Sequence, residues 1–180
     1  MSTPSRDRRW TQEELHALPE DSNTYELIDG ELFVTPAPTD EHGDICARLN
    51  AILVPYVLAQ GLGLVYVPPA VFAVGIRVQV EPDLMVRHQN TDPDGALEKA
   101  PLPSLVVEVL SKRTRNYDLT TKRATYLMAG VAGYWVVDGK ARTCTVFVAD
   151  REPMVVSDEL TWAPAGASVP LTFPLSKVFT

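Results

Sequence analysis

The order of hydrophobic and polar residues predicts a short helix and then a β-hairpin near the start of the chain. Residues 10–15 (WTQEEL) have the spacing of a capped helix N-terminus, with Thr11 as the cap. Hydrophobic and polar residues then alternate over 25–34 on both sides of Asp29-Gly30, a pair typical of two-residue hairpin turns. We therefore expect two antiparallel strands here, with Glu26 on the first.

A second helix is predicted to begin at Thr39 or Asp40. Its hydrophobic residues recur at helical spacing and form one stripe, made of Ile45, Leu49, Ile52, Leu53, Tyr56 and Val57. Pro55 lies inside this pattern, and proline lacks the backbone N–H that an internal helical position donates. We therefore expect Pro55 to kink or shorten the helix.

The rest of the chain predicts several strands and one further helix. Strands are expected at residues 64–67, 70–74, 77–86 with an interruption at Pro82, 105–110, 134–137 and 143–148. The run 105–110 (LVVEVL) is the most strand-like and is predicted to be central in a sheet. A helix is expected from Asp118, as its cap, to Ala129, whereas residues 151–180 have no clear pattern. This order predicts one α/β domain over residues 10–180, a mixed sheet with helices packed on it.

The composition is that of an ordinary globular protein. The 180 residues are 46% hydrophobic and 22% charged, which suits one domain with a hydrophobic core. No hydrophobic run approaches the roughly 18 residues that span a bilayer, so we expect no membrane partner. Residues 1–9 are polar and basic and are predicted to be a disordered tail. Two distant cysteines, Cys46 and Cys144, favour free thiols and a cytoplasmic location.

The distribution of charge points to a local basic cluster. The net charge of −7 argues against a protein that coats nucleic acid without specificity, because such binding depends on Lys and Arg. Residues 112–123 nevertheless contain the cations Lys112, Arg113, Arg115, Lys122 and Arg123, against one acid, Asp118. This cluster follows Glu108 closely, so Arg113, Arg115 and Arg123 are candidates for contacting a substrate. A solvated surface is the alternative interpretation.

Two acidic residues in strand-like runs are the main candidates for chemistry. Glu108 lies in the middle of a hydrophobic strand, where an unpaired buried charge would cost several kcal/mol or more. Asp83 follows Pro82 in another strand-like run, and Lys122 follows on the predicted helix. A divalent cation shared by the two carboxylates would compensate for the buried charge. The combination of two carboxylates and a lysine is typical of metal-dependent phosphodiesterases.

Each of these residues also has an ordinary structural interpretation. Asp83 could be a turn residue, because Pro-Asp pairs are common in turns. Glu108 could face solvent or pair with Arg113. Lys122 could form a helix-surface pair with Asp118, four residues before it.

The predicted chemistry assigns a role to each candidate. Hydrolysis of a phosphodiester requires an activated water and neutralised charge, which Mg²⁺ held by carboxylates supplies, with Mn²⁺ as a substitute. We expect Asp83 and Glu108 to be the ligands, with the carbonyl oxygen of Val109 as a further ligand. Lys122 would orient the water or stabilise the developing negative charge. His42 would contact a phosphate or assist proton transfer, with a helix-cap role as the alternative.

The chain resembles the Uma-two family of putative restriction endonucleases. The resemblance lies in residues 10–32, in Pro82-Asp83-Leu84, in Val107-Glu108-Val109-Leu110-Ser111 and in residues 118–138, and extends over roughly 10–148. The closing stretch 173–179 is also similar to the family.

This resemblance implies a restriction-endonuclease-like PD-(D/E)xK fold, a mixed sheet flanked by helices, in a homodimer that uses Mg²⁺. It makes Asp83 and Glu108 metal ligands, Lys122 the catalytic lysine and Glu26 an accessory acid; an exposed strand position is the alternative for Glu26. The chain departs from the superfamily at Leu110, where a lysine is usual, and the family resemblance implies that the next helix supplies the lysine. Residues 111–114 (SKRT) also replace the more usual Ser-Pro-Ser-Thr.

The sequence therefore leads to a hypothesis of a cytoplasmic, Mg²⁺-dependent DNA endonuclease. RNA stays open as the substrate. The alternative is a catalytically inactive nuclease-fold module that binds DNA or a protein partner. Its support is the acidic isoelectric point of about 4.9 and the missing strand lysine.

Overall fold

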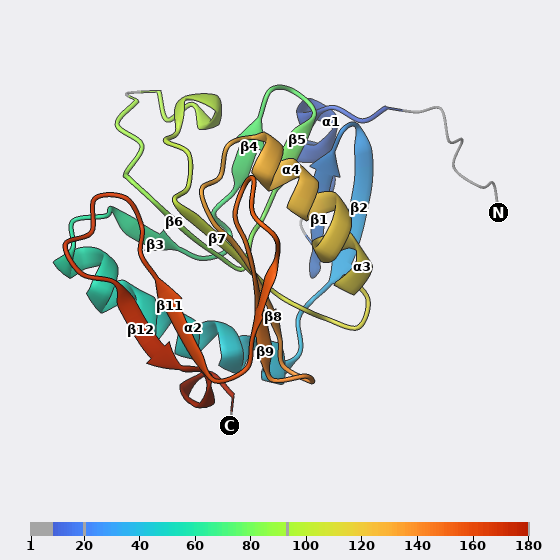
Figure 1. Cartoon of the computed structure of the whole chain (residues 1–180). Helices are drawn as coiled ribbons and strands as arrows, with labels where there is room; N and C mark the ends of the chain where they lie inside the picture. Colours follow the sequence, from blue (N-terminus) through green and yellow to red (C-terminus); the bar gives the residue numbers. More distant parts are fainter. Residues whose placement is uncertain (1–8, 20, 93, 180) are drawn as a thin grey trace.

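The computed structural model describes residues 9–19, 21–92 and 94–179 (Figure 1). The disordered tail predicted at residues 1–9 lies outside this part of the chain except for Arg9. That residue forms an ion pair with Asp29, in which the guanidinium nitrogen and the carboxylate oxygen are 3.5 Å apart.

Helices are interspersed among runs of consecutive strands along the chain. The helices are α1 (Gln12–His16), α2 (Asp40–Ala59), α3 (Arg115–Tyr117) and α4 (Arg123–Met128), with a π-helical turn (Asp118–Lys122) between α3 and α4 and 3₁₀ turns at Leu97–Lys99 and Leu175–Lys177. The strands are β1 (Asn23–Ile28), β2 (Glu31–Pro36), β3 (Leu64–Tyr66), β4 (Phe72–Val74), β5 (Val78–Val80), β6 (Leu84–Arg87), β7 (Leu105–Val109), β8 (Tyr134–Asp138), β9 (Thr143–Phe147), β10 (Met154–Val156), β11 (Glu159–Trp162) and β12 (Leu171–Pro174). The predicted α/β class is therefore confirmed.

The strands form three sheets rather than the one sheet that the sequence predicts. A six-stranded mixed sheet has the order β10-β9-β8-β7-β6-β3, in which only β7 and β8 are parallel. A four-stranded antiparallel sheet has the order β2-β1-β5-β4, and β11 pairs with β12 alone. The strand β7 lies inside the larger sheet, as its hydrophobic sequence predicts.

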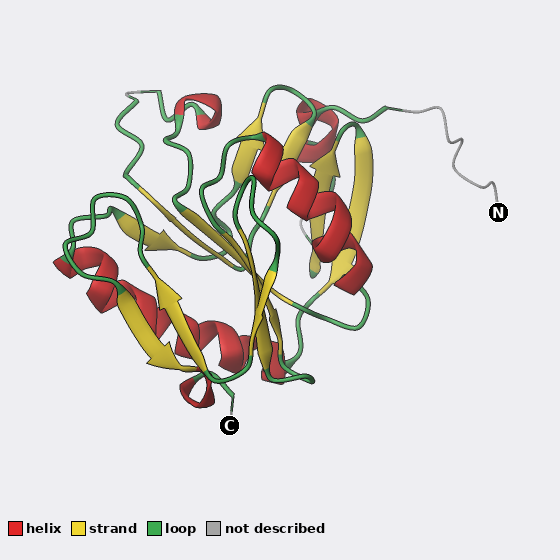
Figure 2. Ribbon diagram, viewed as in Figure 1, coloured by secondary structure: helices red, strands yellow, loops and turns green. Residues whose placement is uncertain are grey.

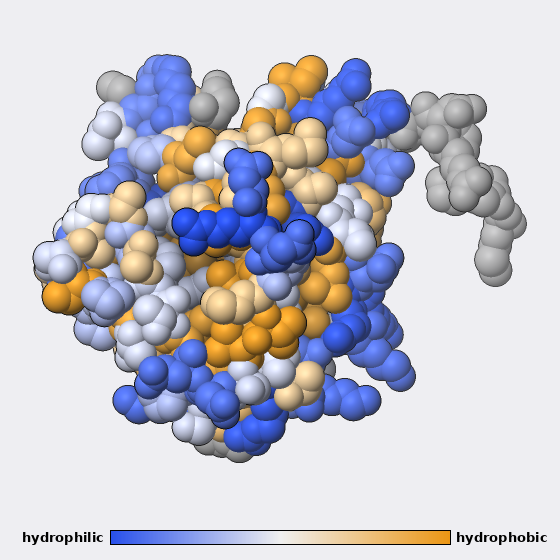
Figure 3. Space-filling view, viewed as in Figure 1, coloured by the Kyte–Doolittle hydropathy of each residue, from blue (hydrophilic) through white to orange (hydrophobic). Residues whose placement is uncertain are grey.

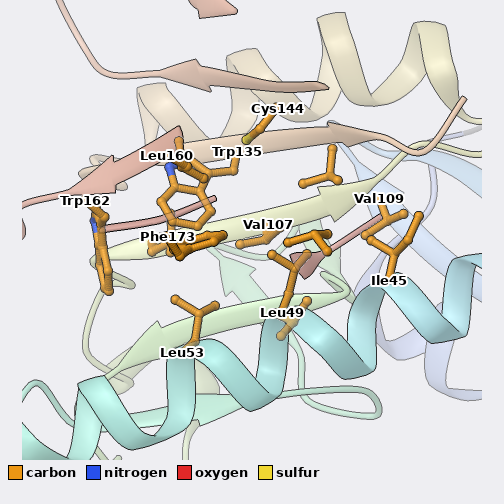
Figure 4. Packing of buried hydrophobic residues seen from close by; sticks show 14 of the residues in the cluster. Ile45, Leu49, Leu53, Val107, Val109, Trp135, Cys144, Leu160, Trp162 and Phe173 are labelled. Carbon is orange, nitrogen blue, oxygen red and sulfur yellow. The ribbon is translucent and has the colours of Figure 1, made fainter. Parts of the chain in front are cut away.

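The two faces of the six-stranded sheet cover different layers (Figure 2). One face packs on α2, β11 and β12, and the residues of this cluster include Leu49, Leu53, Val107, Trp135 and Phe173 (Figure 4). The opposite face, with Val106 and Val136, packs on residues of β4, β5 and α4. Because successive strand residues point to opposite faces, Glu108 shares the second face with Val106.

The predicted hairpin is present, and its turn explains why. Ile28 pairs with Glu31 across the turn, and Asp29 and Gly30 have φ angles of 52° and 81°. A tight hairpin turn of this kind requires positive φ at both central residues, which glycine adopts freely and aspartate tolerates. The sequence therefore places Glu26 on β1 correctly, although the residue is buried rather than exposed.

Pro55 is predicted to kink or shorten the second helix, and the shortening is wrong. Thr39 caps α2, as expected, and the helix continues through Pro55 to Ala59. Pro55 and Ala51 are both on the exposed side of α2. The carbonyl of Ala51, which would accept the missing N–H of Pro55, can therefore be hydrated at little cost.

The expected strand at residues 77–86 is two strands in different sheets. β5 ends at Val80 and pairs with β1, whereas β6 begins at Leu84 and pairs with β7. Pro82 lies between them and has no N–H to donate to a ladder, so the chain changes sheets at this position. Asp83 consequently lies directly at the start of β6.

The predicted cap of the next helix is also wrong. The helix starts at Arg115 rather than at Asp118, and Asp118 lies inside it, in the π-helical turn. Asp118 is 2% exposed, so its side chain is an internal group rather than a cap. The predicted end of the helix is confirmed, since Gly130 follows α4 with a φ of 91°.

Hydrophobic side chains gather in several areas of the face shown in Figure 3, with hydrophilic side chains between them. Met154 and Val155 of the edge strand β10 are 53% and 67% exposed.

Both cysteines are free thiols, as the sequence predicts. Among the described residues, no helix is both long and hydrophobic enough to cross a membrane.

Candidate active site

A buried lysine connects the two larger sheets. Lys122 Nζ lies 2.9 Å from Glu26 Oε1 and 3.0 Å from Glu108 Oε1. Glu26 belongs to β1 of the four-stranded sheet, and Glu108 belongs to β7 of the six-stranded sheet. The three side chains are at most 5% exposed, so water cannot solvate their charges. The positive charge of Lys122 compensates the negative charges of Glu26 and Glu108 instead. The structure thus brings together three residues that are distant in the sequence.

Lys122 reaches this position from the π-helical turn. Such turns insert an extra residue into a helix and often occur at functional sites. Asp118, Lys122 and Tyr126 follow one another at intervals of four residues, and all three are buried. Tyr126 donates its hydroxyl hydrogen to Glu108 Oε1 at 2.8 Å. This one side of the helix therefore supplies two donors to the same carboxylate.

Burial and charge act in opposite directions on the central pair. Burial raises the pKa of Glu108 well above its ordinary value, and the positive charge of Lys122 offsets only part of that effect. Burial alone would lower the pKa of Lys122, but the negative charges of Glu108, Glu26 and Asp118 outweigh it and raise the pKa well above its ordinary value. Lys122 is therefore an ammonium group at neutral pH.

Asp118 adds a further acid to this cluster. Its Oδ1 atom is 3.9 Å from Lys122 Nζ and has no hydrogen-bond partner within the described part of the chain. Burial raises the pKa of Asp118 to about 6, against the lowering effects of Lys122 and of a hydrogen bond with Thr114. A buried oxygen without a donor is a costly group, which a cation can compensate.

Asp83 lies beside Glu108 on the neighbouring strand. Leu84 pairs with Val107 across β6 and β7, so the residues flanking them, Asp83 and Glu108, are adjacent. Asp83 Oδ2 accepts a hydrogen bond from the amide of Val109 at 2.7 Å. The same oxygen is 3.1 Å from Nε2 of His42, on α2. Asp83 is therefore fixed between α2 and the end of β7.

The donor set suits a divalent cation. Five acids lie in this region, namely Glu26, Glu81, Asp83, Glu108 and Asp118, and Lys122 and His42 lie among them. Burial, and next the charge of Glu26, raise the pKa of Glu81. Carboxylate oxygens are the preferred ligands of Mg²⁺ and Mn²⁺. The unsatisfied oxygen of Asp118 and the excess of acids therefore fit such an ion.

The other predicted site residues have different surroundings. Val109 is buried at the end of β7, and its amide is bound to Asp83. Arg113 is exposed on the turn before α3. Arg115 forms an ion pair with Asp138. The guanidinium of Arg123 lies 4.6 Å from the ring centre of Phe147. The structure does not bring these arginines into the buried cluster.

Sequence reasoning missed three groups at this site. The sequence predicts that Asp118 is a helix cap, and it assigns no role to Tyr126 or Glu81. The intervals of four residues from Asp118 to Tyr126 could have revealed one buried polar side of the helix. The alternative pairing of Glu108 with Arg113 is wrong, since the side-chain partners of Glu108 are Lys122 and Tyr126. A solvent-facing Glu108 is also excluded, because this residue is 4% exposed.

Comparison with known proteins agrees with the resemblance in the sequence. Residues 12–176 match the model of the Uma2 family, whose description is "putative restriction endonuclease". The structure is similar to that of a putative nuclease belonging to DUF820 from Anabaena variabilis, with a TM-score of 0.79 and 23% identity over 94% of this chain and 97% of that chain. This likeness shows a shared fold. No curated protein matches the chain. The chain belongs to the Uma2 family and has the nuclease-like α/β fold that its sequence predicts.

Proposed function

We propose that this protein is a metal-dependent endonuclease that hydrolyses DNA phosphodiester bonds. The observation that carries the proposal is the buried contact of Lys122 with Glu26 and Glu108, next to Asp83. Membership of the Uma2 family supports the same class of activity. The acids supply ligands for a cation, and the lysine supplies a positive charge for a phosphate.

Asp83 and Glu108 would hold the metal ion, with the carbonyl oxygen of Val109 as a third protein ligand. When bound there, Mg²⁺ or Mn²⁺ lowers the pKa of water and neutralises charge on the phosphate. The two carboxylates come from neighbouring strands of a rigid sheet, so their relative position is set by the backbone pairing.

Lys122 would act as a charge and as a hydrogen-bond donor, not as a base. Because its pKa is raised by Glu108, Glu26 and Asp118, it keeps its proton at neutral pH despite its burial. A buried ammonium stabilises negative charge that develops on a phosphate more strongly than an exposed one, because the local dielectric constant is low. Glu26 holds the ammonium in place and thereby orients it.

His42 would contact the substrate side of the site or transfer a proton. Burial tends to lower the pKa of His42, but the hydrogen bond and charge of Asp83 outweigh burial and raise it. His42 therefore carries a positive charge over a wider pH range than a free imidazole does. Arg113, Arg115 and Arg123 would contact DNA phosphates outside the buried cluster.

Plasmid cleavage tests the proposal. The wild-type protein is incubated with supercoiled DNA and Mg²⁺ or Mn²⁺, in parallel with Asp83→Asn and Glu108→Gln. The exposed Glu152→Gln variant is the matched control, since it removes an acid outside the cluster. We expect nicking by the wild-type and the control proteins, none with EDTA and none by the two site variants. Equal cleavage by all four proteins would refute the assignment.

The second candidate function is a nuclease-fold module without catalysis. It is favoured by Leu110, which occupies the position two residues after Glu108 where the superfamily usually has lysine. Such a module would bind DNA or a protein partner without cleaving DNA. Retention of DNA in a gel-shift assay, together with intact plasmid in the presence of Mn²⁺, would support this alternative.

We propose a homodimer in the cytoplasm, with DNA rather than RNA as the substrate. Sedimentation measures the oligomeric state, and competition between DNA and RNA of equal length measures the preference.

A further inference from the structure

A second cluster of metal-ligating side chains lies on the α2 side of Asp83. It consists of His42 and Cys46, one helical turn apart on α2, together with Asp83 at the start of β6. One ligand atom from each residue lies within 4.8 Å of the other two. His42 Nε2 is 3.1 Å from Asp83 Oδ2, and His42 Nδ1 is 3.6 Å from Cys46 Sγ.

We propose that His42, Cys46 and Asp83 form a binding site for Zn²⁺, distinct from the carboxylate set that would hold Mg²⁺. A thiolate and an imidazole select borderline-soft ions such as Zn²⁺, whereas Mg²⁺ prefers oxygen. Three protein ligands and one open position are a common arrangement for zinc. Only Asp83 belongs to both sets.

The geometry is close to what zinc requires. Zinc bond lengths of about 2.0–2.3 Å in a tetrahedral site place neighbouring ligand atoms roughly 3.5 Å apart. His42 Nε2 and Asp83 Oδ2 are 3.1 Å apart, somewhat closer than that spacing. Cys46 Sγ contacts the other ring nitrogen, His42 Nδ1, so a rotamer change of Cys46 or His42 is required for one ion to bind all three side chains.

An ion can reach the site from solvent. A cavity of about 230 Å³ is lined by His42, Cys46 and Asp83, together with Asn50 and Pro68. The side chains of His42 and Asp83 are 15% and 17% exposed. The cavity has room for the water that would complete the coordination of the ion.

Binding would follow ordinary acid–base balance. Cys46 loses its thiol proton to solvent when its sulfur binds the ion. His42 binds as the neutral imidazole, so a protonated His42 also releases one proton to solvent. Asp83 contributes its carboxylate, so the site gives the Zn²⁺ ion a total ligand charge of −2. No oxidant or reductant is involved.

Cobalt titration tests the site, because Co²⁺ occupies zinc sites and gives a thiolate-to-metal charge-transfer band in the near ultraviolet. The full-length protein is titrated with Co²⁺ and then with Zn²⁺, in parallel with Cys46→Ser. The Cys144→Ala variant is the control, since Cys144 is the other cysteine and is not one of the three ligating residues. Far-ultraviolet circular dichroism shows that each variant is folded.

We expect the band in the wild-type and Cys144→Ala proteins, its loss in Cys46→Ser, and its displacement by Zn²⁺. Competition titration should give a Zn²⁺ affinity that falls on the order of 10–100-fold in Cys46→Ser, with Mn²⁺ affinity unchanged. Absence of the band from folded wild-type protein, or its persistence in Cys46→Ser, would overturn the proposal. Neither result depends on nuclease activity, so the site can fail while the proposed function stands.

Discussion

Lys122 donates a hydrogen bond to Glu108 at 3.0 Å, and both side chains are 5% exposed. The two residues are fourteen positions apart, on a π-helical turn and on the central strand β7. This pair places a permanent positive charge beside a carboxylate whose burial alone would favour protonation. The proposed catalytic role and the stability of the site therefore depend on the same contact.

Replacing Lys122 with methionine should destabilise the protein strongly. The variant would leave Glu26 and Glu108 buried without their shared cation, which typically costs about 3–5 kcal/mol of unfolding free energy. Urea denaturation at neutral pH measures the change. Lys99→Met is the control, because Lys99 is exposed in its ion pair with Asp92 and should contribute at most about 1 kcal/mol. Similar losses in both variants would contradict the role given to the buried pair.

Replacing Asp118 with asparagine should remove part of the pH dependence of stability. The native pKa of about 6 is higher than the ordinary value of 3.8, so protonation of Asp118 favours the folded state. Its contribution is complete below pH 3.8 and is lost as the pH rises through about 6.

Urea denaturation in EDTA at pH 5 and pH 8 checks this prediction. Wild-type protein should lose more stability between these pH values than Asp118→Asn, by on the order of 1–2 kcal/mol. Glu152→Gln, at an exposed position, should behave as the wild type does. A pH dependence that is unchanged in Asp118→Asn would show that Asp118 does not titrate in this range.

Replacing Tyr126 with phenylalanine should cost about 1–3 kcal/mol of unfolding free energy, since Glu108 loses a buried donor while the ring remains. The ring still packs against Phe72 and Tyr134. Differential scanning calorimetry gives the change. Tyr25→Phe is the comparison, because Tyr25 makes its hydrogen bond to Asp21 at an exposed position. An effect of Tyr126→Phe no larger than that of Tyr25→Phe would mean that the hydrogen bond contributes little.

Local sequence patterns were sufficient for several elements. Asp29-Gly30 predicts the first hairpin because the turn requires positive φ, and the stripe from Ile45 to Val57 predicts α2 because helical spacing gathers hydrophobic residues on one side. Glu108 also stands out locally, since a charge inside a hydrophobic strand requires compensation.

The predictions that are wrong concern features that depend on tertiary packing. The spacing of Asp118, Lys122 and Tyr126 places them on one side of the helix, but the packing of that side against β7 depends on residues distant in the sequence. Pro82 indicates an interruption within residues 77–86, but the assignment of β5 and β6 to different sheets depends on their partner strands. The strands β11 and β12 are short, and they are stabilised by the contacts of Trp162 and Phe173 with Trp135.

Calorimetric titration with Mn²⁺ tests the central claim most directly, because it measures metal binding without requiring a known DNA sequence. Wild-type protein, Asp83→Asn, Glu108→Gln and the exposed-site control Glu152→Gln are compared at pH 7.5. We predict saturable binding by the wild-type and control proteins, and affinity at least about tenfold weaker in the two site variants. Equal Mn²⁺ affinity in all four folded proteins would contradict the claim that Asp83 and Glu108 hold the ion.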